Sequence, residues 1–273
     1  MTHTNNIVTA AVVLLVIVLC GGLLIFILAN QNDIVTLEGK NISILGDSIS
    51  TFDGINNDGT NANTTISGNA VFYPRYEIDK VEKTWWKQAI DGTGMKLLVN
   101  NSWSGSKVTI DNGAAYRERA TELHADTGSN KGANPDIIAV YMGVNDFNHK
   151  VELGSFKELS EVYTKADGYI APENFAQAYA ITLHKITQKY KKADVYAFTL
   201  PYNGRNSDTA TMDKYNDTIR SIAKYFKCRV VDIAAIDGYD YSKYTCDGLH
   251  PNEQGMDLIT DLFVRTLKSV YKK

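Results

Sequence analysis

The residues most able to do chemistry lie in two short segments near opposite ends of the chain. Gly46-Asp47-Ser48-Ile49-Ser50 places a serine directly after an apolar run, where a strand-to-loop turn can expose its hydroxyl. A serine hydroxyl is a weak nucleophile until a base removes its proton. Cys246-Asp247-Gly248-Leu249-His250-Pro251 supplies such a base in His250, with the Asp247 carboxylate within reach in the same turn. These residue types predict nucleophilic catalysis by a triad of Ser48, Asp247 and His250.

Two further segments carry hydrogen-bond donors suited to the oxyanion of an acyl-transfer intermediate. In Asn100-Asn101-Ser102-Trp103-Ser104-Gly105, the absence of a side chain at Gly105 lets its backbone N–H approach a ligand. In Gly143-Val144-Asn145-Asp146, the Asn145 amide is a neutral donor. Taken singly, all four segments are also typical of ordinary turns and helix caps. Their combination is what favours a catalytic site.

Apolar runs and amphipathic stretches alternate along the chain. The predicted strands are Asn41–Leu45, Lys96–Asn100, Asp136–Met142, Asp194–Leu200 and Arg229–Ile233. Nearly continuous apolar runs are typical of strands that are covered on both faces. The predicted helices are Thr84–Ile90, Ala114–Ala125, Pro172–Lys191, Asp208–Phe226 and Asn252–Tyr271, with Pro172 as a first helical residue and Leu258, Leu262, Val264 and Leu267 on the inner face of the last helix.

This alternation predicts a parallel sheet with helices on both faces and right-handed crossovers. Ligands of such folds bind beyond the carboxyl ends of the strands. Ser48 follows the first run, Asn101–Gly105 the second, Gly143–Asp146 the third, and Asp247–His250 lies beyond the fifth. We therefore expect four loops to converge on one edge of the sheet.

The segments GDSIS, NNSWSG, GVND and DGLHP resemble the four sequence blocks of the SGNH, or GDSL-type, hydrolase family, in the family's order and over nearly the whole polar part of the chain. The resemblance implies that Ser48 is the nucleophile, His250 the general base and Asp247 its orienting acid. It further implies an oxyanion hole made by the Ser48 N–H, the Gly105 N–H and the Asn145 side chain. The implied fold is a flavodoxin-like three-layer α/β/α sandwich with a parallel five-stranded sheet, and the implied reaction is cleavage of carboxylic esters without a metal.

The chain departs from the family pattern in the long connection Thr51–Lys83, which is rich in Asn, Gly and Thr and includes VFYPRY. Connections of this length are usually functional or mobile. Trp103, Tyr73 and His149 are the candidate substrate-binding residues near the four segments. Trp85 and Trp86 are expected to pack a helix on the sheet instead.

Composition limits the partners and cofactors. The 28 basic and 31 acidic residues leave a formal charge of -3, which excludes the basic excess typical of nucleic-acid binding. Asp247 and His250 could ligate a metal, but no other cluster of ligands completes a set, so no cofactor is predicted. Cys228 and Cys246 are expected at positions too far apart for a disulfide.

The N-terminal part has a different character. Ile7 to Ala29 is apolar and uncharged, and a helix of this length, about 35 Å, would cross a bilayer core of about 30 Å. We predict a tail and transmembrane anchor over residues 1–30, a linker over 31–40 and a hydrolase domain over 41–273, with the domain on the extracellular side of a single-pass membrane protein. A signal peptide that is cleaved to release a secreted enzyme is the alternative.

These features together predict a serine esterase that acts on O-acetyl or short acyl groups of an extracellular carbohydrate. The loops favour a polar substrate because they are rich in Asn, Gly, Thr and Tyr. A lipase or lysophospholipase, and an acyltransferase with the same triad, remain the alternatives. A binding module without activity is disfavoured because all four segments are intact.

Overall fold

The structure is a computed structural model that describes residues 37–55, 71–109, 119–125, 130–155 and 174–271. Leu37–Val270 forms one compact unit. Its first residue, Leu37, is buried, and the Gly39 N–H donates to the Gly94 carbonyl, so the end of the predicted linker packs with this unit. The predicted transmembrane segment lies outside the described residues and stays a prediction. Within the described ranges, no helix is long and apolar enough to cross a membrane.

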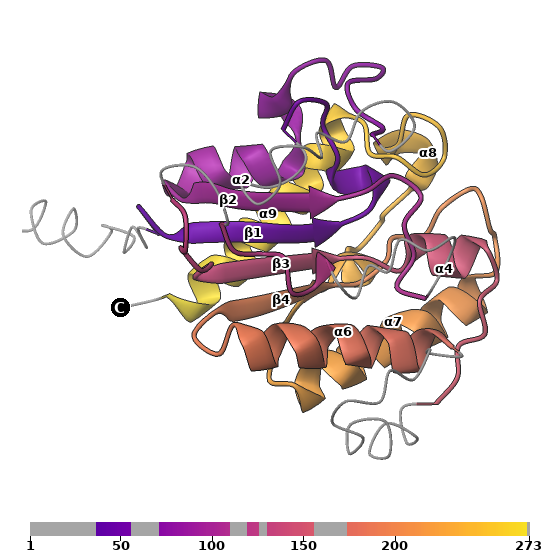
Figure 1. Cartoon of the computed structure of the whole chain (residues 1–273). Helices are drawn as coiled ribbons and strands as arrows, with labels where there is room; N and C mark the ends of the chain where they lie inside the picture. Colours follow the sequence, from indigo (N-terminus) through magenta and orange to yellow (C-terminus); the bar gives the residue numbers. More distant parts are fainter. Residues whose placement is uncertain (1–36, 56–70, 110–118, 126–129, 156–173, 272–273) are drawn as a thin grey trace, which may run out of the picture. The chain divides into compact units, whose positions relative to one another are not determined.

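The centre of the unit is a five-stranded parallel sheet with the strand order β2-β1-β3-β4-β5 (Figure 1). Its strands are β1 (Asn41–Gly46), β2 (Lys96–Ser102), β3 (Ile137–Tyr141), β4 (Asp194–Phe198) and β5 (Arg229–Val231). Every residue of β3 is buried, as expected of an apolar strand with helices on both faces. The predicted parallel five-stranded sheet is thus confirmed, and its order is that of a doubly wound fold.

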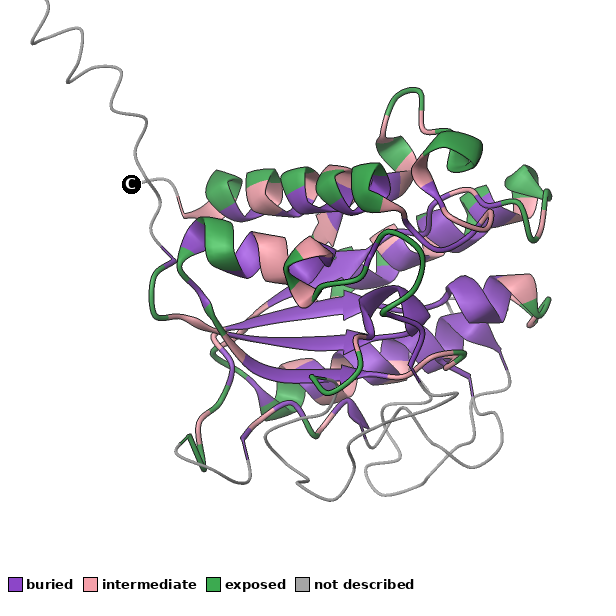
Figure 2. Cartoon of the chain, turned by 90° about the horizontal axis from the view of Figure 1, so that it is seen from above, coloured by how far each residue is buried: buried purple, intermediate pink, exposed green. Residues whose placement is uncertain are grey.

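Helices cover both faces of this sheet (Figures 1 and 2). On one face lie α2 (Trp85–Thr93) and α9 (Glu253–Val270), and on the other lie α6 (Phe175–Lys189) and α7 (Thr209–Tyr225). Side-chain caps fix three of the four starts, because Thr84, Asn174 and Asp208 accept hydrogen bonds from N–H groups in the first turns of α2, α6 and α7. Figure 2 shows these helices buried on the side toward the sheet and exposed on the side away from it.

Two predicted helices differ in detail from the observed ones. Helix α6 begins at Phe175 after the Asn174 cap, whereas Pro172, the predicted first helical residue, lies outside the described residues. In α9, Leu267 is buried as predicted, but Leu258, Leu262 and Val264 are half-buried. The inner face is made by Met256, Ile259, Phe263 and Leu267, whose spacing follows the helical period more closely. The helix predicted over Ala114–Ala125 is wrong in its described part: residues 114–118 lie outside the described residues, and from Ala120 to Ala125 the chain forms turns and irregular structure, in which the Leu123 N–H donates to the Tyr190 hydroxyl at 2.8 Å instead of to a helix carbonyl.

The tryptophan pair at the start of α2 is completely buried, which confirms its predicted packing role. Both indole groups also reach the chain just after Ser48. The Trp85 indole N–H donates to Ser50 Oγ at 3.2 Å, and the Trp86 indole N–H donates to the Ser50 carbonyl at 3.1 Å. Buried indole groups need such partners. The packing of α2 on the sheet therefore also fixes the turn that carries Ser48.

Candidate active site

Ser48 lies in a tight turn at the carboxyl end of β1. It begins a 3-10 helix, Ser48–Ser50, whose N-cap Asp47 accepts a hydrogen bond from the Ile49 N–H at 3.0 Å. A Cβ added at Gly46 would lie 2.6 Å from Ser102 Oγ and 2.7 Å from Ser50 Cβ, so only glycine fits where the turn folds back on the strand. Ser48 is 3% exposed. As the first residue of a helical turn, its N–H has no acceptor within that turn.

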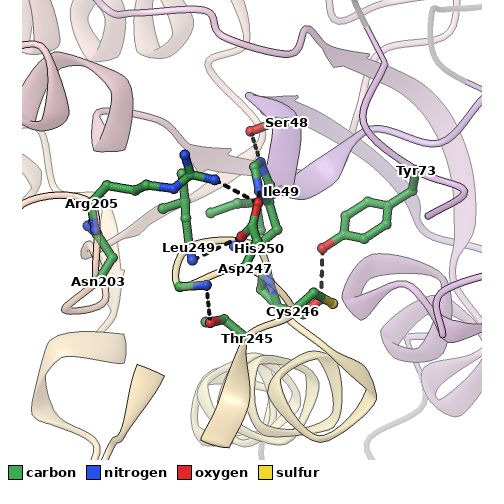
Figure 3. A network of polar contacts seen from close by, with 12 residues as sticks. Ser48, Ile49, Tyr73, Asn203, Arg205, Thr245, Cys246, Asp247, Leu249 and His250 are labelled. Atoms are coloured by element: carbon green, nitrogen blue, oxygen red, sulfur yellow. Dashed lines mark hydrogen bonds and ion pairs between the residues drawn. The ribbon is translucent and has the colours of Figure 1, made fainter. Parts of the chain in front are cut away.

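The predicted triad forms one hydrogen-bonded chain at this edge of the sheet (Figure 3). His250 Nε2 lies 2.9 Å from Ser48 Oγ, and His250 Nδ1 lies 2.9 Å from Asp247 Oδ2. The second carboxylate oxygen, Oδ1, accepts the backbone N–H groups of His250 at 2.9 Å and Leu249 at 3.1 Å. One turn thus carries both Asp247 and His250, while Ser48 comes from the other end of the chain.

The protonation states follow from these contacts. Burial raises the pKa of Asp247. The hydrogen bonds from the His250 N–H, the His250 side chain and the Leu249 N–H outweigh this effect and lower the pKa to about 2. The carboxylate is therefore ionised at neutral pH and can only accept hydrogen bonds. His250 Nδ1 must then carry the proton, which leaves the Nε2 lone pair to accept the Ser48 hydroxyl. This is the arrangement in which an imidazole can act as a base toward serine.

The pKa of His250 is lowered from its ordinary value. Burial disfavours the charged imidazolium, the Asp247 hydrogen bond and charge offset part of this, and the charges of Arg205 and Arg75 lower the pKa further. The base is accordingly unprotonated at neutral pH.

The two other predicted oxyanion donors lie in loops that contact each other. Gly105, at φ +77°, occupies a turn closed by a hydrogen bond of 3.2 Å from the Ser106 N–H to the Trp103 carbonyl. A positive φ at this position favours glycine. Asn145 is in α4 (Val144–Asn148), directly after β3, and its side-chain amide donates to the Ser106 carbonyl at 2.9 Å. An amide nitrogen has two hydrogens, so this bond leaves Asn145 a second one to donate.

Asp146 holds the loop after β2 through three further hydrogen bonds. Its Oδ2 accepts the Val108 N–H at 2.8 Å, and its Oδ1 accepts both the N–H and the hydroxyl of Thr109, at 3.0 and 2.7 Å. Burial raises the pKa of Asp146 to about 6, although these hydrogen bonds lower it. Adjacent residues of α4 thus hold the loop after β2 at Ser106 and again at Val108 and Thr109.

A buried arginine lies beside the end of β1. Arg119 Nη2 donates to the Gly46 carbonyl at 3.2 Å, and its guanidinium carbon lies 5.5 Å from the centre of the Trp103 ring. Burial lowers the pKa of Arg119 to about 9, while the Asp47 charge raises it. Burial likewise raises the pKa of Asp47, to about 7. Burial thus disfavours the charged form of both groups, and the attraction between their opposite charges opposes this effect beside the Ser48 turn.

The three candidate substrate-binding residues lie in different environments. Trp103 is half-buried beside Arg119, and His149 is exposed at the end of α4, so contacts of these two residues with a substrate stay predictions. Tyr73 is completely buried, and its hydroxyl donates to the Pro251 carbonyl at 2.8 Å. The expectation for Tyr73 is corrected by this position, because its side chain supports the His250 turn and has no face open to a substrate.

The sequence analysis missed two residues that contact the triad. Arg205, in the loop after β4, donates from Nη2 to Asp247 Oδ2 at 2.9 Å, and Figure 3 shows it approaching the turn from the side opposite Tyr73. The Phe72 ring stacks on the His250 imidazole, with ring centres 3.4 Å apart and planes inclined by 12°. The first could have been found by searching the loop after the fourth predicted strand, and the second from the aromatic cluster at the end of the long connection.

The remaining ligand chemistry is sparse. Among the residues that the structure describes, no group of three or more His, Cys, Asp or Glu side chains could hold a metal ion. Cys228 and Cys246 are both free thiols in the structure.

Comparison with known proteins agrees with this fold. The family model of GDSL-like lipases and acylhydrolases matches residues 40–267, and the chain therefore belongs to this family of ester-hydrolysing enzymes. No curated protein matched the chain.

Solved structures give the same result. The chain is 26% identical to a protein from Bacteroides uniformis described as a GDSL-like lipase, with a TM-score of 0.62 and coverage of 85% of this chain and 96% of that one. A similarly described protein from Bacteroides ovatus is 25% identical, with a TM-score of 0.61 and coverage of 85% and 99%. An acetylxylan esterase from Geobacillus stearothermophilus has the same fold at 15% identity and a TM-score of 0.53, covering 84% and 94%.

Proposed function

We propose that this enzyme hydrolyses carboxylic esters through an acyl-enzyme on Ser48, with His250 as the general base and Asp247 as the carboxylate that orients it. The observation that carries the proposal is the chain from Ser48 Oγ through both ring nitrogens of His250 to Asp247, with 2.9 Å at each step. Membership of an ester-hydrolysing family supplies the reaction class.

The first half of the reaction forms the acyl-enzyme. His250 Nε2 takes the hydroxyl proton while Ser48 Oγ bonds to the ester carbonyl carbon, and the carbonyl oxygen becomes an oxyanion. We assign the Ser48 N–H, the Gly105 N–H and the Asn145 amide as its donors. When the intermediate collapses, the C–O bond to the alcohol breaks and His250 returns the proton to the leaving oxygen. In the second half, His250 deprotonates a water whose oxygen bonds to the acyl carbon. The bond from that carbon to Ser48 Oγ then breaks, His250 returns the proton to Oγ, and the carboxylic acid leaves.

The proposed substrate is an O-acetyl or short acyl ester of an extracellular carbohydrate. The exposed residues around His250 support this choice. The charges of Arg75 and Arg205 act on His250, and the exposed Tyr76 ring lies 6.4 Å from Phe72, which stacks on His250. Polar hydrogen-bond donors and aromatic rings suit a sugar better than a long acyl chain. Fold similarity to an acetylxylan esterase makes acetylated xylan a reasonable first substrate to test.

We further propose that residues 1–30 anchor the enzyme at the outer face of a membrane. The uncharged run Ile7 to Ala29 supports this, because its length matches a bilayer core of about 30 Å. An enzyme held there would meet polysaccharide esters outside the cell.

The test is turnover by Ser48→Ala with short-chain and long-chain acyl esters and acetylated xylan. We expect no turnover, because no other group can form the acyl-enzyme, and nearly as large a loss in His250→Ala. Ser269→Ala is the matched control, since Ser269 is exposed near the end of α9 and bonds only within that helix. Turnover by Ser48→Ala near that of the control would disprove the mechanism.

Substrate preference is tested separately with the unmodified enzyme. Faster cleavage of octanoyl esters or lysophospholipids than of acetyl esters would replace the carbohydrate assignment with a lipase. Acyl transfer to an added sugar alcohol in preference to water would replace hydrolysis with transfer.

A further inference from the structure

The segment Val71–Tyr76 connects the nucleophile turn to the base. At one end, Thr51 Oγ1 donates to the Ser48 carbonyl at 2.9 Å and accepts the Phe72 N–H at 2.8 Å. The Thr51 side chain therefore links the backbone of Phe72 to the Ser48 turn. The next residue is fastened twice, because the Tyr73 carbonyl accepts the Asp53 N–H at 2.9 Å and its hydroxyl reaches the Pro251 carbonyl. The segment is therefore held on both sides of the Phe72 ring.

This ring packs on one face of the catalytic imidazole. With ring centres 3.4 Å apart and an inclination of 12°, the two rings are in face-to-face contact, and Phe72 is 9% exposed. The Tyr73 ring meets the same imidazole edge-on, with centres 6.4 Å apart and an angle of 90°. The rings of Phe72 and Tyr73 therefore enclose His250 on the side that faces this segment.

Hydrogen bonds alone leave one motion of the imidazole weakly restrained. The hydrogen bonds at Nδ1 and Nε2, each 2.9 Å long, fix where the two ring nitrogens point. Rocking of the ring out of that plane changes these two distances little, whereas it moves the ring directly against whatever lies on its face. A flat ring in contact at that face resists this motion, and it also attracts the cationic imidazolium that forms when Ser48 loses its proton.

Resting on the proposed triad, we propose that Phe72 is a positioning residue for His250, whose ring holds the imidazole plane in line with Ser48 and Asp247. Phe72, in the described part of the long connection, would then complete the site in this chain. Its role is in the catalytic step and not in binding.

The test replaces the ring while keeping an apolar side chain. Phe72→Leu should lower kcat about 10-fold with KM within about 2-fold, because misorientation of a catalytic group affects the reaction more than binding. Phe72→Tyr keeps the ring and should restore kcat to within about 2-fold of the unmodified enzyme. Phe226→Leu is the matched control. The Phe226 ring, just after α7, also lies beside a histidine, with its centre 5.9 Å from that of His184 in α6. It should leave kcat unchanged.

A second readout does not depend on turnover. In the full chain labelled with 15N-histidine, with the His250 signals assigned by their loss in His250→Gln, we expect a single neutral tautomer protonated at Nδ1. Phe72→Leu should broaden these signals or mix the tautomers, and Phe226→Leu should not.

The outcomes separate the two proposals. Normal kcat and unchanged His250 signals in Phe72→Leu would overturn the positioning role, as would equal losses in Phe72→Leu and Phe72→Tyr. If the unmodified enzyme turned over no ester, yet Phe72→Leu alone disturbed the His250 signals, the esterase proposal would fail and the positioning role would stand.

Discussion

Removing one hydroxyl, in Tyr73→Phe, should destabilise the protein by about 2 kcal/mol. The Pro251 carbonyl then keeps the weak thiol donor of Cys246, at 3.6 Å, and loses its strong one, and a buried carbonyl that loses a donor costs about 1–3 kcal/mol. The Tyr73 side chain is completely buried, and its hydroxyl donates to the Pro251 carbonyl at 2.8 Å. Burial raises the pKa of this hydroxyl well above its ordinary value, so it remains a donor at every pH of interest. For a unit of this size, about 2 kcal/mol corresponds to a fall in Tm of about 4–8 °C. Since Pro251 follows the base, kcat should also fall a few-fold.

Tyr179→Phe is the matched control, and its expected sign is the opposite. Tyr179 is also completely buried, but its hydroxyl has no hydrogen-bond partner among the described residues. Removing an unpaired buried hydroxyl should leave Tm unchanged or raise it. The assay is thermal unfolding of both variants by circular dichroism, together with kcat on an acetyl ester. Equal shifts in Tm for the two variants, or a Tm for Tyr73→Phe equal to that of the unmodified enzyme, would refute the reasoning.

Three further predictions follow from the site and the N-terminal segment. The pH profile of kcat/KM should have its acidic half-point below pH 6.5. Arg75→Gln should move this half-point to higher pH, because removing a nearby positive charge favours protonated His250. An unchanged or lower half-point in Arg75→Gln would contradict this. Asp146→Asn places an amide N–H₂ against backbone donors of the loop that carries Gly105, so kcat should fall on the order of 100-fold, and kcat within twofold of normal would exclude this role. Extraction of the full chain should require detergent, whereas a chain beginning at Gln31 should stay in solution; a soluble mature protein that begins near Gln31 would favour signal cleavage.

The sheet could be predicted because its signal is local. Each strand is an apolar run flanked by polar residues. A strand in a parallel sheet is buried on both faces, and this burial requires apolar residues along its whole length. The same holds for the convergence of Ser48 and His250, since parallel strands place their following loops at one edge. Strand ends differed from the prediction by a residue or two, as at β3, which occupies Ile137–Tyr141 within the predicted Asp136–Met142.

The supports of the triad could not be predicted in the same way. Phe72 and Tyr73 belong to a connection with no helical or strand periodicity, so the sequence does not predict which way their side chains point. For this reason the contact of Phe72 with His250 was missed, and Tyr73 was expected to face a substrate. Arg205 depends on a turn in which Asn203 Oδ1 accepts the Arg205 N–H at 3.0 Å and the Gly204 N–H bonds to the Gly248 carbonyl at 2.7 Å. Such contacts are set by tertiary structure, and only the final packing selects among the many loop conformations.

The low pKa of His250 follows from the way this site is closed. Phe72 and Tyr73 remove water from the imidazole, and burial is the largest influence on its pKa; Arg205 and Arg75 act in the same direction, and only Asp247 opposes them. In the proposed mechanism, this low pKa leaves His250 free of a proton over a wider range of pH than an exposed histidine, so that it can accept the Ser48 proton. A base with a low pKa is also a weaker acceptor of the Ser48 proton, so the imidazolium depends on Asp247, whose own pKa of about 2 keeps its charge in place, and on the aromatic face of Phe72. Because Phe72 and Tyr73 exclude water from His250, the imidazolium needs the Asp247 carboxylate and the Phe72 ring to stabilise its positive charge.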